Sequence, residues 1–330
     1  MKGNTSKTAL IFGILGQAGS YLREFLAKRG YAIIGTTRRL YAPQTGHGES
    51  SLLQGIDMSD FDLVKSIIRK TNPDEIYNFA SQMYAPASWE DPEAVVRVNG
   101  LVVAAILEAV RSAKSPARFF QAGSADIFGH PADVCSELTP SRPRNPYGIA
   151  KAIAGDLVRV YREHYDLFAC TGIFFNMESS RRSEFFFARK VVIEVARMRR
   201  EHDAGTIPQP IVFKGGLDAI RDWGLVPEYV EASWKMLDAD QPDDYVIATG
   251  ASYTCREFVV QALLEAGFPD ACERFGDYVC SGTGAGDVMR ADPSKIRCNL
   301  GWRASTRGTD VVHALVREEL ERWRGQSPAV

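Results

Sequence analysis

Three side chains near the middle of the sequence have the types and the spacing for acid–base chemistry. Tyr147 and Lys151 are four residues apart, which places both on one face of a helix. A lysine ammonium beside a tyrosine favours the phenolate, so it would move the pKa of the phenol toward values useful for proton transfer near neutral pH. Ser124 ends an apolar run about twenty residues earlier, and its hydroxyl could hold the same substrate oxygen.

Asp126 adds a carboxylate two residues after Ser124, and it could act as a base or simply cap a turn. A Tyr-x-x-x-Lys spacing by itself is common in purely structural helices. The sequence predicts a proton-transfer site made of Ser124, Asp126, Tyr147 and Lys151 because a nucleotide-binding pattern accompanies them.

That pattern is a glycine-rich turn near the N-terminus. Gly13, Gly16 and Gly19 follow the apolar run Thr8–Phe12 and lead into a helical pattern that starts near Ser20. Such glycines permit a tight turn, a close approach of the backbone to a pyrophosphate, and close helix–strand packing. A helix N-terminus also offers free N–H groups to the anion. A glycine triplet can be a plain turn, but at the first strand–helix junction it predicts dinucleotide binding.

The residues after the second and third strands predict which dinucleotide binds. Arg38 and Arg39 follow the second strand directly. An acidic residue there suits a ribose 2′-hydroxyl, whereas arginine suits a 2′-phosphate, so we expect NADP rather than NAD. The alternative is a solvated pair of charges on a loop. Asp57 could lie near the adenine at the end of the third strand, or it could cap a helix.

The elements that must position these residues alternate along the first half of the chain. Apolar runs predict strands at Thr8–Gly13, Ala32–Thr37, Glu75–Ala80, Ala117–Ala122 and Phe168–Phe175. Helical patterns lie between them at Ser20–Arg29, Phe61–Thr71, Pro92–Ser112 and Pro146–His164. This alternation predicts an α/β fold with a doubly wound parallel Rossmann sheet.

Two domains are expected in a chain of 330 residues. We predict an NADP-binding Rossmann domain over residues 1–175. From about Asn176 the pattern becomes irregular and rich in glycine and proline, which predicts a smaller, interleaved α/β lobe over residues 176–330. Some later strands and helices of this nucleotide-sugar-binding lobe can rejoin the first domain, and a cleft is expected between the two.

Composition excludes several classes of protein. The 39 Lys and Arg residues nearly balance 41 Asp and Glu residues, which argues against binding to nucleic acid or to an anionic membrane. No apolar run is long enough to span a membrane, and the polar N-terminus does not resemble a signal peptide. The six cysteines are scattered and the five histidines lack ligand spacing, so we expect free thiols in the cytoplasm and no protein-bound metal.

From Ala9 to about Trp302, the chain resembles the extended short-chain dehydrogenase/reductases, and within them the GDP-mannose 4,6-dehydratase family. The segments that carry the resemblance are Gly13–Leu22, Arg38-Arg39, Asn78–Ala80, Ser88-Trp89, Tyr147–Lys151, Phe175–Glu184, Arg189-Lys190, Arg221–Gly224, Tyr245–Gly250, Asp292–Lys295 and Leu300–Trp302.

The resemblance implies a bound NADP and a GDP-sugar substrate, either GDP-mannose or a related GDP-hexose or heptose. It implies contacts with this nucleotide-sugar for Ser88, Asn176, Lys190 and Arg221. Arg221 would bind the diphosphate, unless it forms an internal salt bridge with Asp222. The loop with Arg181 and Arg182, in such enzymes, reaches toward a neighbouring subunit's cofactor. A homodimer or a homotetramer built from dimers is therefore expected, and a solvated loop is the alternative.

The reaction implied by the resemblance begins with oxidation of the sugar at C4, where Tyr147 removes the hydroxyl proton. A carboxylate then takes the C5 proton, water leaves from C6, and the hydride returns to C6. The family has Thr-Ser-Glu where this chain has Ser124-Ala125-Asp126. The acid is one methylene shorter, or about 1.5 Å, and a misplacement of ~1 Å can cost about a hundredfold in rate.

A second departure from the family lies near the C-terminus. The family's Arg-Pro-x-Glu, which contacts the nucleotide's ribose and base, aligns with Gly282–Ala285. We expect a flexible loop near the cleft there.

Three functions remain open from the sequence. The first is an NADP-dependent 4,6-dehydratase, a lyase. The second is a GDP-sugar 4-dehydrogenase, reductase or epimerase that does not eliminate water. The third is a non-catalytic NADP-binding sensor, which the presence of both Tyr147 and Lys151 disfavours.

Overall fold

Seven parallel strands form the central sheet of the protein. The computed structural model describes residues 6–40, 50–81, 85–113, 116–131, 133–282 and 286–324. The sheet order is β10-β6-β5-β4-β1-β2-β3. The strands are β1 (Thr8–Phe12), β2 (Ala32–Thr36), β3 (Ser50–Leu53), β4 (Glu75–Asn78), β5 (Arg118–Ala122), β6 (Ala169–Phe174) and β10 (Tyr245–Ile247). The order reverses between β1 and β4, and doubly wound sheets bind ligands at the carboxyl ends of strands beside such a reversal.

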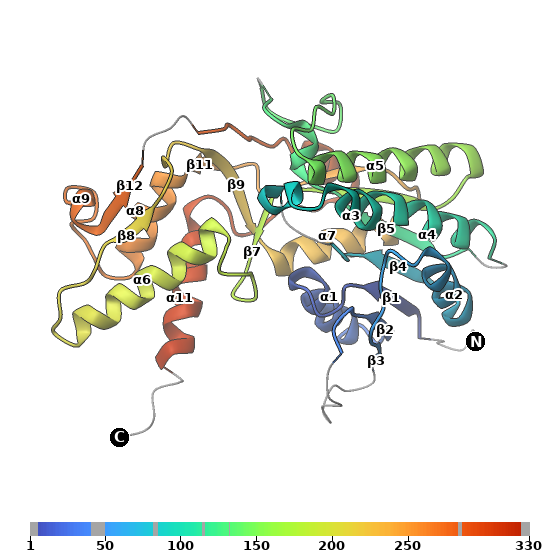
Figure 1. The fold of residues 1–330 in the computed structure, drawn as a ribbon, viewed down its shortest axis with the longest axis horizontal. Coiled ribbons are helices and arrows are strands. Elements are labelled where there is room, and N and C mark those ends of the chain that lie inside the picture. Colours follow the sequence, from blue (N-terminus) through green and yellow to red (C-terminus); the bar gives the residue numbers. More distant parts are fainter. Residues whose placement is uncertain are drawn as a thin grey trace.

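Helices cover both faces of this sheet (Figure 1). One face carries α1 (Gln17–Ala27) and α7 (Val226–Asp238). The other carries α2 (Phe61–Thr71), α4 (Val102–Arg111) and α5 (Pro146–Tyr165). Because both faces are covered, strands of the sheet are largely buried, and β4, β6 and β10 are buried at every position. The predicted doubly wound α/β fold is confirmed.

The helix predicted over Pro92–Ser112 is interrupted. It consists of α3 (Pro92–Val96), a π-helical turn η2 (Arg97–Leu101) and then α4. A π turn admits an extra residue. Here Gly100 lies so near α5 that a Cβ would come within 3.1 Å of the Ala150 carbonyl oxygen. Apolar residues stay buried on both sides of the turn, so the hydrophobic pattern did not reveal the break.

The second lobe has a core of its own, in which Trp223 and Phe258 are fully buried. Its strands form the sheets β11-β9-β7 and β12-β8. They are β7 (Asn176–Glu178), β8 (Ile211–Phe213), β9 (Ile220–Leu225), β11 (Ser252–Thr254) and β12 (Val279–Ser281). Its helices are α6 (Phe187–Asp203), α8 (Cys255–Glu265), α9 (Phe275–Tyr278) and α11 (Thr309–Arg324).

Three late elements lie with the central sheet instead of the second lobe. Strand β10 pairs in parallel with β6, α7 packs against α1, and α10 (Ser294–Leu300) contacts β10. Two short 3-10 helices, η1 (Ala85–Trp89) and η3 (Ala125–Phe128), follow β4 and β5.

Residues 287–292, which we call the strap, run from the second lobe to the Rossmann domain (Figure 1). The first half of the strap pairs with β9, where the backbone of Ile220 exchanges hydrogen bonds with Asp287 and Met289. The second half pairs with the backbone of Cys135, in the loop between η3 and α5. The strap therefore ties the two parts of the molecule together.

None of the helices in the described ranges combines the length and the apolar character needed to cross a membrane.

Candidate active site

The N-terminal cap of α5 fixes the two residues with the Tyr-x-x-x-Lys spacing. The Asn145 Oδ1 atom accepts a hydrogen bond from the backbone N–H of Gly148 at 2.7 Å, and Pro146 occupies the first helical position. Tyr147 consequently lies in the first turn and Lys151 one turn later. The Lys151 Nζ atom donates to the carbonyl of Ala122, at the end of β5, at 2.8 Å. It lies 5.5 Å from the centre of the Tyr147 ring.

Burial moves the pKa values of these two groups in opposite directions. Desolvation of the ammonium lowers the pKa of Lys151 to about 8, while the negative charge of Asp126 partly offsets this shift. Desolvation of the phenol, followed by the Asp126 charge, raises the pKa of Tyr147 to about 12. Hydrogen bonds with Ser124 and Ser81 and the charge of Arg182 lower it in part. The protein's own groups therefore do not produce the expected phenolate near neutral pH.

Ser124 and Asp126 lie at η3, directly after β5. Ser124 is the N-cap of this turn, because its Oγ atom accepts a hydrogen bond from the Asp126 backbone N–H at 3.2 Å. The same hydroxyl donates to the Asp126 Oδ2 atom at 3.0 Å. The shorter acid is thus bonded to the serine that contacts Tyr147. The structure brings Ser124, Asp126, Tyr147 and Lys151 into one group, and their role in proton transfer stays a prediction.

Ser81 is a member of this group that the sequence analysis missed. Its side chain hydrogen-bonds with Tyr147, and the residue also lines the pocket beside the glycine turn. A signal for it was present, because Ser81 follows β4 by three residues, much as Ser124 follows β5 by two. The carboxyl ends of these adjacent parallel strands meet at the same edge of the sheet.

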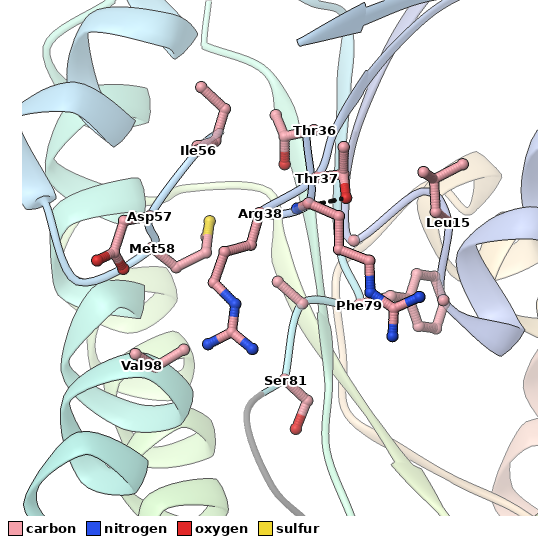
Figure 2. A pocket seen from close by; sticks show the side chains of 14 residues that line it. Leu15, Thr36, Thr37, Arg38, Ile56, Asp57, Met58, Phe79, Ser81 and Val98 are labelled. Carbon is pink, nitrogen blue, oxygen red and sulfur yellow. Dashed lines mark hydrogen bonds between the residues drawn. The ribbon is translucent and has the colours of Figure 1, made fainter. Parts of the chain in front are cut away.

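A pocket of about 290 Å³ lies where the sheet order reverses (Figure 2). Its walls come from the end of β2, from the segments that follow β1, β2, β3 and β4, and from η2. Figure 2 shows the side chain of Arg38 extending into the pocket between Val98 and Ser81. The full lining is Gly13, Leu15, Gly16, Thr36, Thr37, Arg38, Arg39, Ile56, Asp57, Met58, Phe79, Ala80, Ser81 and Val98.

The charges in this pocket come from the residues predicted for the adenosine end of a dinucleotide. The Asp57 Oδ1 atom accepts a hydrogen bond from the backbone N–H of Ser59 at 2.8 Å. This bond, the Ser59 hydroxyl and then the cations Arg38 and Arg97 hold the pKa of Asp57 below its ordinary value. The backbone N–H of Arg39 donates to the Thr37 hydroxyl at 3.2 Å.

The glycine turn packs so closely against the neighbouring backbone that a Cβ atom would clash at two of its glycines. Gly13 has a φ of +80°, and a Cβ there would lie 2.8 Å from the backbone nitrogen of Ala80. A Cβ on Gly19 would clash with the Gly13 carbonyl oxygen at 2.3 Å. Helix α1 begins at Gln17, before the predicted start near Ser20, so Gly19 packs within its first turn. These residues and the adjoining pocket fit a nicotinamide dinucleotide, with the turn at the diphosphate and Arg38 at the adenosine end.

The side chains of Arg181 and Arg182 point in different directions. The Arg181 guanidinium donates to the Ser20 hydroxyl at 3.0 Å, pairs with Glu24 at 2.8 Å and stacks on Tyr21, all on α1 of the same chain. Arg181 therefore clamps the second lobe to the helix of the glycine turn. Its predicted contact with a cofactor remains a prediction.

Arg182 instead lies near Tyr147, on the side of the candidate active site that the second lobe forms. Its Nε atom lies 3.2 Å from the Glu178 Oε2 atom, and its guanidinium stacks 3.7 Å from the centre of the Phe186 ring. Burial is the main reason why the pKa of Glu178 is raised to about 7, although Arg182 partly offsets it. Nothing in the sequence analysis indicated that this glutamate is buried.

The residues predicted to bind the nucleotide-sugar are distributed across both parts of the molecule. Asn176 is partly buried on β7, opposite Trp223 of β9. The Lys190 Nζ atom donates to the carbonyl of Val212 at 2.8 Å, on the second lobe. Ser88 is completely buried in η1.

The fourth of these residues, Arg221, does not pair with Asp222. Its Nη2 atom lies 3.6 Å from the Oδ2 atom of Asp287 on the strap. Asp222 is buried and accepts hydrogen bonds from Thr249 and Gly250 instead. Burial raises the pKa of Asp222 to about 6, and these hydrogen bonds limit the rise. Arg221 therefore faces the strap, whereas Asp222 joins β9 to the turn after β10.

Residues 283–285, most of the glycine-rich segment Gly282–Ala285, lie outside the described residues. Within the described ranges, no three His, Cys, Asp or Glu side chains gather in a metal-binding arrangement.

Comparisons with known proteins point to one family. The chain matches the family model described as GDP-mannose 4,6 dehydratase over residues 10–315. It is 36% identical to GDP-mannose 4,6 dehydratase 2 of Caenorhabditis elegans, over 95% of this chain and 89% of that protein.

Two solved structures show the same fold at low sequence identity. One is UDP-glucose 4-epimerase of Thermus thermophilus in complex with NAD, with a TM-score of 0.79, 22% identity, and coverage of 97% of this chain and 99% of the other. The other is RMD from Pseudomonas aeruginosa complexed with NADPH, with a TM-score of 0.77, 18% identity, and coverage of 96% of this chain and 100% of the other. The family match and the identity to the Caenorhabditis elegans protein together establish that this chain belongs to the GDP-mannose 4,6-dehydratase family of extended short-chain dehydrogenase/reductases.

Proposed function

We propose that this protein is an NADP-dependent nucleotide-sugar 4,6-dehydratase that acts on GDP-mannose or a related GDP-hexose or heptose. The observation that carries the proposal is the grouping of Ser124, Asp126, Tyr147 and Lys151 at the carboxyl end of β5, in a chain of this family. Structures with this fold bind NAD in one protein and NADPH in another, so the fold alone does not choose the cofactor. Arg38 in the pocket supports NADP.

Tyr147 is the residue proposed to move the proton of the sugar's C4 hydroxyl. Its phenol oxygen hydrogen-bonds with Ser124 and Ser81, which would orient it toward a substrate oxygen at the same place. Lys151 is fixed by the Ala122 carbonyl and contributes a nearby positive charge when protonated. A bound nicotinamide would supply the acceptor for the C4 hydride and the donor of the hydride to C6, so the cycle would be redox-neutral.

Asp126 is the residue proposed to act in the elimination. A ketone at C4 acidifies the C5 hydrogen, and the Asp126 carboxylate takes that proton. The acid form of Asp126 then donates to the C6 hydroxyl, which leaves as water. C5 is protonated again after the hydride has returned to C6. The proton that Tyr147 took from the C4 hydroxyl accounts for this one, so the number of protons is conserved over the cycle. The Ser124 hydroxyl, bonded to Asp126 at 3.0 Å, holds this carboxylate close to Tyr147.

The test is to incubate the protein with GDP-mannose and NADP and to identify the product by mass spectrometry. A 4-keto-6-deoxy sugar nucleotide, lighter than the substrate by the mass of one water, is expected. Tyr147→Phe should lower kcat by about 10²–10⁴-fold, the usual contribution of general acid–base catalysis. Tyr161→Phe is a matched control on the same helix, because the Tyr161 hydroxyl bonds to Glu108, away from the site. Unchanged substrate with both GDP-mannose and GDP-manno-heptose would contradict the proposal.

A second candidate is a GDP-sugar 4-dehydrogenase, reductase or epimerase. The shorter acid favours it, because Asp126 is one methylene shorter than the glutamate of the family pattern, and a base displaced by ~1 Å can lose about a hundredfold in rate. Asp126→Asn separates the candidates. A dehydratase variant should lose the elimination while NADPH absorbance still rises in a single turnover. A simple dehydrogenase should keep its full activity.

A further inference from the structure

Charges from both parts of the molecule act on the phenol of Tyr147. Burial is the main reason why the pKa of this phenol is raised to about 12, and the Asp126 carboxylate in η3 raises it further. Arg182, which follows β7 of the second lobe, is a cation that lowers it. Lys151 adds a charge from α5 itself when it is protonated, and its Nζ atom lies 5.5 Å from the centre of the Tyr147 ring. The acidity of Tyr147 therefore depends on the second lobe as well as on the Rossmann domain.

The guanidinium of Arg182 is held in place by three contacts within the second lobe. Its Nη1 atom donates to the carbonyl of Met177 at 2.5 Å. Its plane stacks on the Phe186 ring, and its Nε atom lies 3.2 Å from the Glu178 Oε2 atom. The Arg182 side chain is 14% exposed and that of Glu178 is 3% exposed. Because water is largely excluded from this pair, its charges interact strongly with each other and with nearby groups.

Glu178 opposes the charge of Arg182 once it is ionised. Burial raises the pKa of Glu178 to about 7, so the side chain is an anion at alkaline pH. Two more phenols face it, Tyr229 of α7 and Tyr253 of β11, and burial raises the pKa of both far above neutral, so they stay uncharged. A second carboxylate, Asp222 of β9, acts on the same two phenols. Arg182 and Glu178 thus form a buried pair whose net charge changes when the glutamate ionises.

We propose that Arg182 is a positioning residue of the proton-transfer site: its charge, supplied by the second lobe, stabilises the ionised phenol of Tyr147, and Glu178 sets how much of that charge the phenol experiences. The inference rests on the proposed function, because it takes Tyr147 as the group that moves the C4 hydroxyl proton. A phenol must be ionised before it can take a proton, and an opposite charge close by favours the ionised form. The tyrosine is therefore completed as a base only when the second lobe lies against the Rossmann domain.

The ionisation of this phenol can be measured without substrate by incorporating difluorotyrosine at position 147. Fluorine makes the phenol more acidic, so fluorine NMR can follow its titration at a pH where the intact protein is folded. Arg182→Met should move the titration midpoint upward by about one pH unit or more, because an opposite charge is lost. Glu178→Gln should move it downward by up to about one pH unit, because the guanidinium then acts without a neighbouring anion.

The opposite signs of these two shifts separate a role of charge from a role in packing. A purely structural role would loosen the site in both variants and move both midpoints in the same direction. Arg182→Lys keeps the positive charge, so its midpoint should lie close to that of the wild type. Melting temperatures verify that each variant is folded. Arg182→Met should fold, because the buried carboxyl of Glu178 stays protonated at neutral pH when its cation is removed.

Matched controls come from an ion pair on α6 of the second lobe. The Arg197 Nε atom lies 2.8 Å from the Glu194 Oε2 atom. Arg197→Met and Glu194→Gln should leave the titration midpoint where it is in the wild type. In the assay with GDP-mannose and NADP, Arg182→Met should lower kcat at neutral pH by about tenfold, since one pKa unit changes the phenolate fraction tenfold. Both controls should keep the kcat of the wild type.

The outcomes separate this inference from the proposed function. If Arg182→Met leaves the midpoint unchanged, or if Arg182→Met and Glu178→Gln shift it in the same direction, the inference is wrong and the dehydratase proposal is untouched. If the midpoint shifts as expected but kcat does not fall in Arg182→Met, the proposed role of the charge in proton transfer is overturned. If both midpoints shift as expected but the wild type forms no 4-keto-6-deoxy product, the charge pair stands and only the proposed reaction is overturned.

Discussion

Lys151 and Tyr147 illustrate how far residue spacing alone can predict a site. Their four-residue separation correctly placed them on one face of α5, beside Ser124. The spacing carries no information about desolvation, which lowers the pKa of Lys151 to about 8 and raises that of Tyr147 to about 12. With this pKa, the phenol of Tyr147 keeps its proton at neutral pH.

A substitution of Arg38 tests whether the protein prefers NADP or NAD. The side chain extends into the pocket beside Asp57, and its charge contributes to the lowered pKa of that carboxyl. Arg38→Ser should weaken NADP binding by about ten- to a hundredfold, because a charge-assisted hydrogen bond to the 2′-phosphate is lost. NAD binding should stay nearly unchanged. Fluorescence titration with each cofactor measures both, and equal losses for NAD and NADP would argue against a 2′-phosphate contact.

Other features of the site depend on contacts between residues that are distant in the sequence. Asp126 and Ser124 were found because they follow a predicted strand. Glu178 was missed because nothing in its neighbours indicates that Arg182 and the second lobe will enclose it. The alternative pairing of Arg221 with Asp222 is not found, because the strap brings Asp287 to Arg221, and the contact of Arg221 with a diphosphate stays a prediction. Such pairings arise from tertiary packing, which local patterns do not encode.

At the scale of single elements, the glycine turn and the helix that follows it form one packed unit. Gly19 lies in the first turn of α1, against the Gly13 carbonyl. The sequence predicted the turn but placed the start of the helix at Ser20 instead of Gln17, because glycines in a helical position lower the local propensity. Close packing of the helix on the turn outweighs that propensity here. The hydrophobic pattern did not reveal the π turn of η2 either, because buried apolar residues continue on both sides of the turn.

Gly19→Ala tests whether this packing positions the dinucleotide. The added Cβ would clash with the Gly13 carbonyl oxygen at 2.3 Å, so the turn must shift. We expect NADP affinity to fall by at least about tenfold, with a small loss of stability. Gly155→Ala is the matched control on α5, since its Cβ would make only an ordinary contact at 4.0 Å. That variant should bind NADP normally and gain roughly 0.5–1 kcal/mol of stability. Equal NADP affinity in both variants would contradict the predicted role of the turn.

At the scale of the whole molecule, the two lobes are joined by contacts of several kinds. Arg181 clamps the second lobe to α1, and the strap reaches the loop after η3. The alternation of strands and helices predicted the Rossmann sheet well, because each strand there lies between two layers of helices. It predicted the second lobe only as irregular, because short strands and long connections leave no clear period.

Glu178, on the first strand of the second lobe, makes stability depend on pH. Its pKa is about 7 in the folded protein against an ordinary value of 4.5, so the folded state holds a proton that the unfolded state releases between these values. Stability should therefore fall as pH rises from the ordinary pKa through the folded one, by up to about 3 kcal/mol. Glu178→Gln cannot lose this proton. The melting temperature of this variant should increase relative to that of the wild type as the pH rises from 4.5 to about 7.

The control for this prediction is Glu184→Gln, which alters an exposed carboxylate in the segment between β7 and α6. Its melting temperature should follow that of the wild type at every pH. A constant difference between wild type and Glu178→Gln across this range would mean that the glutamate does not change its charge on unfolding.

The pairing of β10 with β6 has a consequence for the newly made chain. Strand β6 is buried at every position, yet its outer neighbour is not synthesised until Tyr245–Ile247. Until then β6 is an unprotected apolar edge, which is the kind of strand that pairs with other chains and aggregates. A fragment that ends near residue 175 should therefore precipitate on its own.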